Sequence, residues 1–171
     1  GTAREARSIQ SLFPEAISFT GSQATETSVK KAAAPRILHL ATHGFFLNAP
    51  DPEKAKAAKS IVSTVENPLL RSGLAFSGAN RRLGTGDDGI LTALEASGLN
   101  LWGTKLVVLS ACDTGVGEVR NGEGVYGLRR SFQIAGAETL VMSLWPVSDL
   151  VTRELMTGYY TNLKQGIGRG G

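Results

Sequence analysis

Hydrophobic residues gather in short unbroken runs that are separated by polar and glycine-rich segments. Residues 37–42 and 106–109 are apolar enough to form strands that are buried on both faces. A third run at 138–144 has the same character, and residues 17–20 and 69–77 are shorter candidates. We therefore predict strands at these five places.

Helices are predicted between the strands by apolar residues three or four positions apart and by capping residues. Thr2 and Glu5 form a capping-box pattern before a helix that Pro14 ends, and Thr92 and Glu95 form a second such pattern. Further helices are predicted at 22–34, 125–135 and 150–164. Strands that alternate with helices favour an α/β fold with a parallel sheet covered on both faces.

The length of 171 residues and the 42% hydrophobic content predict a single domain, residues 1–171. Within it, residues 47–67 turn to Pro, Lys, Ala and Glu, which predicts a surface insertion. Residues 166–171 are rich in glycine, and we expect this end to be frayed.

Charge and cysteine content narrow the class of protein. The 18 basic and 15 acidic residues leave a net charge of only +3, and the basic residues are scattered, so we predict no nucleic-acid partner. No apolar run approaches the roughly 18 residues of a membrane span. A single cysteine cannot form an internal disulfide, which fits a cytoplasmic protein.

That single cysteine is also the first candidate for chemistry. Cys112 follows the run at 106–109, and His43 follows the run at 37–42. Because ligands bind beyond the carboxyl ends of parallel strands, the two side chains meet if these strands are neighbours. Cys112 would then be a nucleophile and His43 an acid and base, with the backbone N–H groups of Cys112 and Gly44 holding an oxyanion.

Each of these residues also has an interpretation without chemistry. A lone buried cysteine is usually a small core residue, and His39, inside the strand, fits a packed or hydrogen-bonded core histidine. Four residues of strand separate His39 and His43 by roughly 13 Å, too far for one zinc ion. The G-x-G-x-x-G match at 84–89 follows no strand and contains two aspartates, which argues against a dinucleotide site. We predict no metal and no cofactor.

Four blocks of sequence together resemble the CHAT domain, the caspase-like domain found with tetratricopeptide repeats. They are L-H-L-A-T-H-G (38–44), V-V-L-S-A-C-D-T-G (107–115), G-E-G-V-Y-G-L-R-R-S-F-Q-I-A-G-A (122–137) and S-L-W-P-V-S-D (143–149). The resemblance implies a three-layer caspase-like α/β fold with a mostly parallel sheet. It also implies cysteine endopeptidase chemistry, with His43 and Cys112 matching the family's dyad.

The same resemblance extends to substrate choice through separase, a relative of the caspases. An acidic residue in the last block lines its pocket for a basic P1 side chain, and Asp149 occupies that place here. Asp149 would pair bidentately with arginine, or it would stabilise the amino end of the last helix beside Ser148. Asp113 is the second pocket candidate. Ser110 departs from the acid that some caspase relatives carry there.

The family's domain begins with further strands, so we expect this chain to lack them and to be the C-terminal portion of a larger protein. The expected partners are a protein or peptide substrate and an upstream tetratricopeptide-repeat or other regulatory domain. Arg120, in the glycine-rich loop after Cys112, is a candidate self-cleavage site. The alternative to a peptidase is a non-catalytic interaction or regulatory module with the same fold.

Overall fold

The computed structural model describes residues 2–47, 67–80, 87–110, 112–113, 123–143 and 148–167. For residues 112, 113, 123–125 and 149 it describes the backbone alone. Most of the predicted insertion, residues 48–66, and the end of the predicted tail, residues 168–171, lie outside the described residues.

Two small sheets form the centre of the described molecule. The first is parallel, with the strand order β1 (Ile37–Leu40), β5 (Leu106–Leu109), β7 (Leu140–Met142). The second has the order β4 (Ile90–Thr92), β3 (Ser72–Ala75), β2 (His43–Phe46), β6 (Cys112–Asp113). In this second sheet β2 and β6 are parallel, whereas β3 runs antiparallel to both β2 and β4.

The two sheets are continuous through two of their strands. The chain passes from β1 to β2 and from β5 to β6 after two residues, and the register does not change: Ile37 pairs with Leu106, and His43 pairs with Cys112 at the same offset along the chain. Between the two ladders, the N–H group of Ser110 donates to the carbonyl oxygen of Leu40 at 2.9 Å. The β1–β5 core ladder therefore extends directly into the β2–β6 pair.

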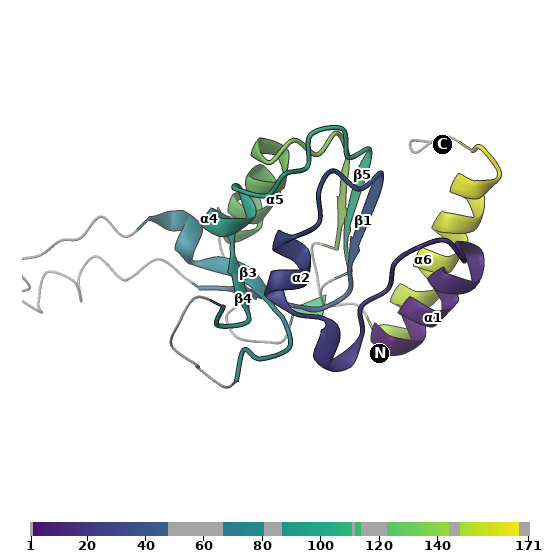
Figure 1. Cartoon of the computed structure of the whole chain (residues 1–171), viewed down its shortest axis with the longest axis horizontal. Helices are drawn as coiled ribbons and strands as arrows, with labels where there is room; N and C mark the ends of the chain where they lie inside the picture. The colour runs from purple at the N-terminus through teal and green to yellow at the C-terminus, as the bar shows by residue number, and fades with distance from the viewer. Residues whose placement is uncertain are drawn as a thin grey trace, which may run out of the picture.

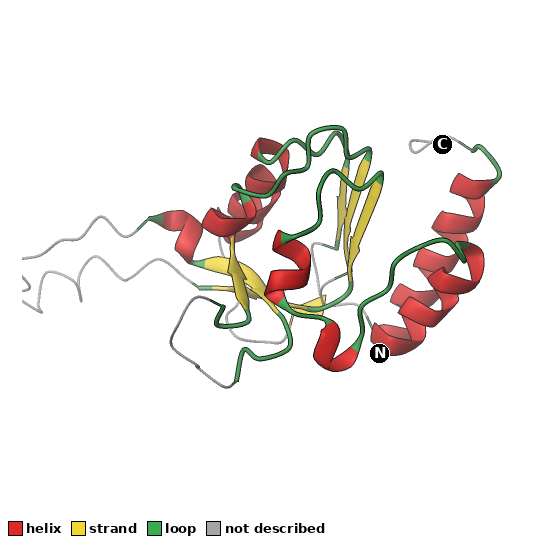
Figure 2. Ribbon diagram, in the orientation of Figure 1, coloured by secondary structure: helices red, strands yellow, loops and turns green. Residues whose placement is uncertain are grey.

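Helices cover both faces of the parallel sheet (Figures 1 and 2). On one side lie α1 (Thr2–Leu12) and α6 (Asp149–Lys164). On the other side lie α2 (Glu26–Lys30), α4 (Ala93–Ala96) and α5 (Glu123–Ile134). Two short 3-10 helices, Gly21–Gln23 and Pro68–Leu70, complete the described elements. The predicted three-layer α/β fold is confirmed.

The central strand β5 shows why this sequence needs helices on both sides. All four of its residues are buried, and they alternate between two cores. Leu106 and Val108 pack with Met156 and Tyr160 of α6, whereas Val107 and Leu109 belong to the core that holds Leu128 and Phe132 of α5. Each buried side chain of this kind contributes about 1.5–3 kcal/mol, so β5 stabilises both layers at once.

Three local predictions are wrong. Residues 17–20 form no strand, since Ile17 is 85% exposed and has no sheet partner. The helix predicted at 22–34 is reduced to Gly21–Gln23 and α2. Residues 69–77 start as a 3-10 helix, because Asn67 caps Leu69 with a 3.1 Å hydrogen bond and Pro68 occupies the first turn, and only Ser72–Ala75 is strand.

Glu5 has a different role from the one that its capping-box spacing predicts. Its carboxylate is buried, and Oε1 lies 3.2 Å from Nε2 of His39 on β1. The other ring nitrogen of His39, Nδ1, lies 2.9 Å from the hydroxyl of Tyr160 on α6. This buried cluster of Glu5, His39 and Tyr160 joins both outer helices to the edge strand, and it confirms His39 as a hydrogen-bonded core histidine.

Candidate functional site

The two residues with candidate chemistry lie on neighbouring strands. His43 begins β2, Cys112 begins β6, and the two are register partners in a parallel pair. Paired positions in a sheet lie on strands about 4.8 Å apart. The sequence placed both residues just beyond their strands. In the structure each strand resumes after two residues, so that the two positions become part of a second ladder.

The next register pair along these two strands consists of Gly44 and Asp113. Gly44, a candidate oxyanion donor, is buried in β2 and pairs with Asp113 on β6 and with Leu74 on β3. Asp113, a candidate pocket residue, therefore lies one position beyond Cys112 on the same short strand. A glycine at this place adds no Cβ atom beside the paired positions.

The strand that carries His43 is supported from its other side by β3. His43 pairs with Ala75, and the hydroxyl of the preceding residue, Thr42, donates to the carbonyl oxygen of Ala75. Ala75 pairs in turn with Ile90 of β4. His43 itself is exposed in the described structure.

Asp149, the other candidate pocket residue, is the first residue of α6. The side chain of Ser148 caps this helix by accepting a 3.4 Å hydrogen bond from the N–H group of Val151. This backbone position suits a carboxylate that interacts with the helix dipole. Arg120, the candidate self-cleavage residue, lies outside the described residues.

Two features of the surroundings were not among the predicted site residues. Ser110, which follows β5, is 5% exposed, and its hydroxyl oxygen has no hydrogen-bond partner among the described residues. Glu26 on α2 is buried and contacts the start of β4, close to the strands that support His43. A polar residue after an apolar run would flag Ser110, but only the fold brings Glu26 to this place.

The part of the chain that the structure describes contains no group of three His, Cys, Asp or Glu residues that could hold a metal ion. None of its helices combines the length and the apolar character needed to cross a membrane.

The fold and the paired positions define a class: an α/β domain in which a histidine and a cysteine are register partners on parallel strands that continue the core ladder. Comparison with known families agrees, because the CHAT domain matches residues 1–170. The chain belongs to the CHAT domain family, which is caspase-like and related to peptidases.

Two curated relatives of the chain are tetratricopeptide repeat proteins. Tetratricopeptide repeat protein 28 of Mus musculus and its counterpart in Homo sapiens are each 35% identical to the chain over 78 residues. That stretch covers 46% of this chain and 3% of the length of each relative. No solved structure is significantly similar to the chain.

Proposed function

We propose that the chain is a cysteine endopeptidase domain whose dyad is Cys112 and His43. The observation that carries this proposal is the register of β2 and β6, which sets the two residues opposite each other. Membership of a caspase-like family supports it. The single cysteine has no partner for a disulfide within the chain, which fits a reducing compartment. We therefore propose that the activity is cytoplasmic.

In the proposed reaction, the thiolate of Cys112 attacks the scissile carbonyl carbon, and the carbonyl oxygen takes the negative charge. Backbone N–H groups of Cys112 and Gly44 stabilise that oxyanion. As the C–N bond breaks, His43 gives its proton to the leaving amine. Water then attacks the thioester, His43 accepts its proton, and the thiolate leaves, which restores the dyad.

We propose Asp149 as the residue that selects arginine or lysine at P1, with Asp113 as the second acid of the pocket. A carboxylate at the base of a pocket pairs bidentately with a guanidinium group and so favours arginine by geometry as well as charge. Arg120 would then be a substrate within the same chain. By analogy with the tetratricopeptide repeat protein relatives, an upstream tetratricopeptide-repeat or other regulatory domain would control the site.

Covalent labelling tests the dyad. A peptide that ends in arginine and carries a thiol-reactive group should add to Cys112 in the wild-type chain, detected as a mass increase located by peptide mapping. Cys112→Ala should remove the label, and His43→Ala should slow it strongly with an unchanged circular dichroism spectrum. If the folded wild-type chain takes up no label at Cys112, the peptidase proposal is wrong.

A matched pair of variants separates the two roles of Asp149. Asp149→Asn removes the charge and should abolish the preference for arginine over a neutral P1 residue. Ser148→Ala removes the helix cap seen in the structure and should lower stability by about 1 kcal/mol without changing that preference. A preference that survives Asp149→Asn would contradict the pocket assignment. For Arg120, an intact mass that stays constant during long incubation of active enzyme would exclude self-cleavage.

A non-catalytic interaction or regulatory module is the second candidate. One observation favours it: His43 is exposed, whereas a catalytic base is usually held in place by a third group. Under this alternative, Cys112→Ala would leave partner binding and every cellular effect unchanged.

A further inference from the structure

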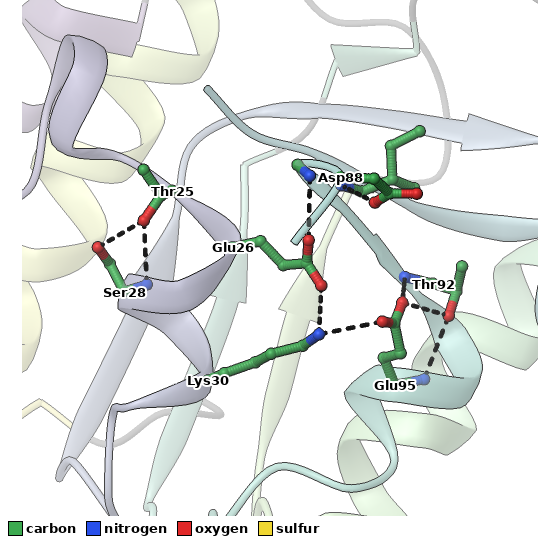
Figure 3. Close-up of polar contacts among 9 residues, drawn as sticks. Thr25, Glu26, Ser28, Lys30, Asp88, Thr92 and Glu95 are labelled. Atoms are coloured by element: carbon green, nitrogen blue, oxygen red, sulfur yellow. Dashed lines mark hydrogen bonds and ion pairs between the residues drawn. The ribbon is translucent and has the colours of Figure 1, made fainter. Parts of the chain in front are cut away.

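A buried carboxylate on the short helix α2 lies among polar groups of other elements (Figure 3). This residue, Glu26, is 1% exposed. Its Oε2 accepts a 3.1 Å hydrogen bond from the N–H group of Gly89, immediately before β4. Its Oε1 forms an ion pair with Lys30, one turn later in the helix. Neither the proposed mechanism nor the core explains a charged group buried at this place.

The charged groups around Glu26 come from three elements. Lys30 of α2 also contacts Glu95 of α4 at 3.0 Å, and Glu95 is held by the capping box that it forms with Thr92. Asp87, in the segment before β4, lies close enough to interact with the Glu26 carboxyl group. Its neighbour Asp88 is turned to the backbone instead and accepts a 2.9 Å hydrogen bond from the N–H group of Ile90.

A short chain of contacts leads from Glu26 to His43. Gly89, which Glu26 holds, accepts a 2.7 Å hydrogen bond from the N–H group of Phe76. The residue after Gly89 pairs with Ala75, and Ala75 pairs with His43. Gly89 also packs tightly against the adjoining turn, because a Cβ atom there would lie 2.4 Å from the backbone nitrogen of Ala79. A displacement of Gly89 therefore reaches the end of β3 beside His43.

We propose that Glu26 is a positioning residue for the candidate dyad: its buried carboxyl group holds Gly89, and through β4 and β3 it holds the strand that carries His43. The link to catalysis rests on the proposed function, whereas the hold on Gly89 does not. Glu26 touches neither the substrate nor the dyad, so it acts only through the backbone.

The protonation state of Glu26 sets the strength of this hold. Burial raises the pKa of its carboxyl group from 4.5 to about 7, the Asp87 carboxylate adds to the rise, and Lys30 opposes it. Ionisation of Glu26 makes the hydrogen bond from Gly89 charge-assisted and strengthens the contact with Lys30, whereas it opposes the contact with Asp87. The hold on Gly89 should therefore change as Glu26 titrates.

Nuclear magnetic resonance of the whole 171-residue chain tests the anchor directly. In the wild type, the amide signals of Gly89 and Ala75 should shift with a midpoint near pH 7. Glu26→Gln, which keeps the neutral hydrogen-bonding shape, should abolish this step. Glu95→Gln is the control. Glu95 contacts the same lysine but not Gly89, so this variant should keep the pH-dependent shift of the Gly89 signal. A Gly89 midpoint near 4.5 in the wild type would overturn the proposal without any variant, and an unchanged step in folded Glu26→Gln would overturn it as well.

Kinetics tests the link to the dyad. The ratio of kcat/KM for the wild type to kcat/KM for Glu26→Gln should be near one at pH 6 and should change several-fold through pH 7, since ionisations common to both enzymes cancel. A ratio that does not depend on pH would overturn the positioning role while the peptidase stands. If neither enzyme cleaves any peptide but the Gly89 step is lost in Glu26→Gln, the proposed function fails and the anchor is supported.

Discussion

The cluster of Glu5, His39 and Tyr160 predicts that one buried hydroxyl group helps to attach the outer helices to the sheet. Tyr160 is 1% exposed, and its hydroxyl lies 2.9 Å from Nδ1 of His39, while Glu5 contacts Nε2. Either tautomer of His39 allows Nδ1 to pair with the Tyr160 hydroxyl, whereas Oε1 of Glu5 lies 3.2 Å from Nε2 without forming a hydrogen bond. Burial raises the pKa of Tyr160 above its usual value, so the phenol keeps its proton and is available as a donor.

Tyr160→Phe removes that donor and keeps the ring, which packs edge-on against Phe13. The loss leaves Nδ1 of His39 unpaired in a buried site, which costs about 1–3 kcal/mol. For a chain of this length, a loss of that size lowers the melting temperature by about 2–10 °C. The matched control is Tyr126→Phe, the same chemical change on a side chain that is 67% exposed, which should lower stability by less than about 0.5 kcal/mol.

Urea unfolding at pH 7, followed by circular dichroism, measures both variants. Adding Glu5→Gln to each background extends the test, because residues that share His39 as a partner should show a coupling energy of at least about 0.5 kcal/mol. Two results would refute the reasoning: equal losses for Tyr160→Phe and Tyr126→Phe, or strict additivity of Glu5→Gln with Tyr160→Phe.

Three further predictions concern packing, backbone and pH. Phe132→Ala should cost about 3–5 kcal/mol in urea unfolding because Phe132 is fully buried, whereas Ile134→Ala, half exposed on the same helix, should cost under about 1 kcal/mol. Gly89→Ala should be much more destabilising than Gly103→Ala in thermal melts: both have positive φ, but only at Gly89 would a Cβ strike backbone, at 2.4 Å. Because the folded state holds the Glu26 proton up to about pH 7, stability should be full below pH 4.5 and fall by about 2–3 kcal/mol as pH rises to 8, a loss that Glu26→Gln should lack.

The core and its layers could be predicted because their signals are local. Four consecutive apolar residues, 106–109, indicate a strand buried on both faces, and the structure buries all four. The capping box of Thr92 and Glu95 starts α4 as predicted, and Ser148 caps α6. In each case residues close in sequence carry the whole physical reason for the element.

The parts that could not be predicted depend on tertiary contacts. Strand β6 has only two residues and exists because β2 lies beside it, so no periodicity marks it. The T-x-x-E spacing of Thr2 and Glu5 has a sufficient local explanation in capping, which hides the contact of Glu5 with His39 on a distant strand. Likewise nothing near Glu26 in the sequence indicates that Gly89 is its partner.

The candidate dyad combines both kinds of information. Each of its residues follows a core strand in the sequence, but their alignment comes from the ladder. The offset that pairs Ile37 with Leu106 also pairs His43 with Cys112. A one-residue slip of a strand with two buried faces would move every side chain into the wrong core, so the packing of β1 and β5 specifies this register strongly. The packing of the four buried residues of β5 thus determines which residue is the register partner of the cysteine. On the other side of β2, strands β3 and β4 support His43, and Glu26 contacts the segment before β4.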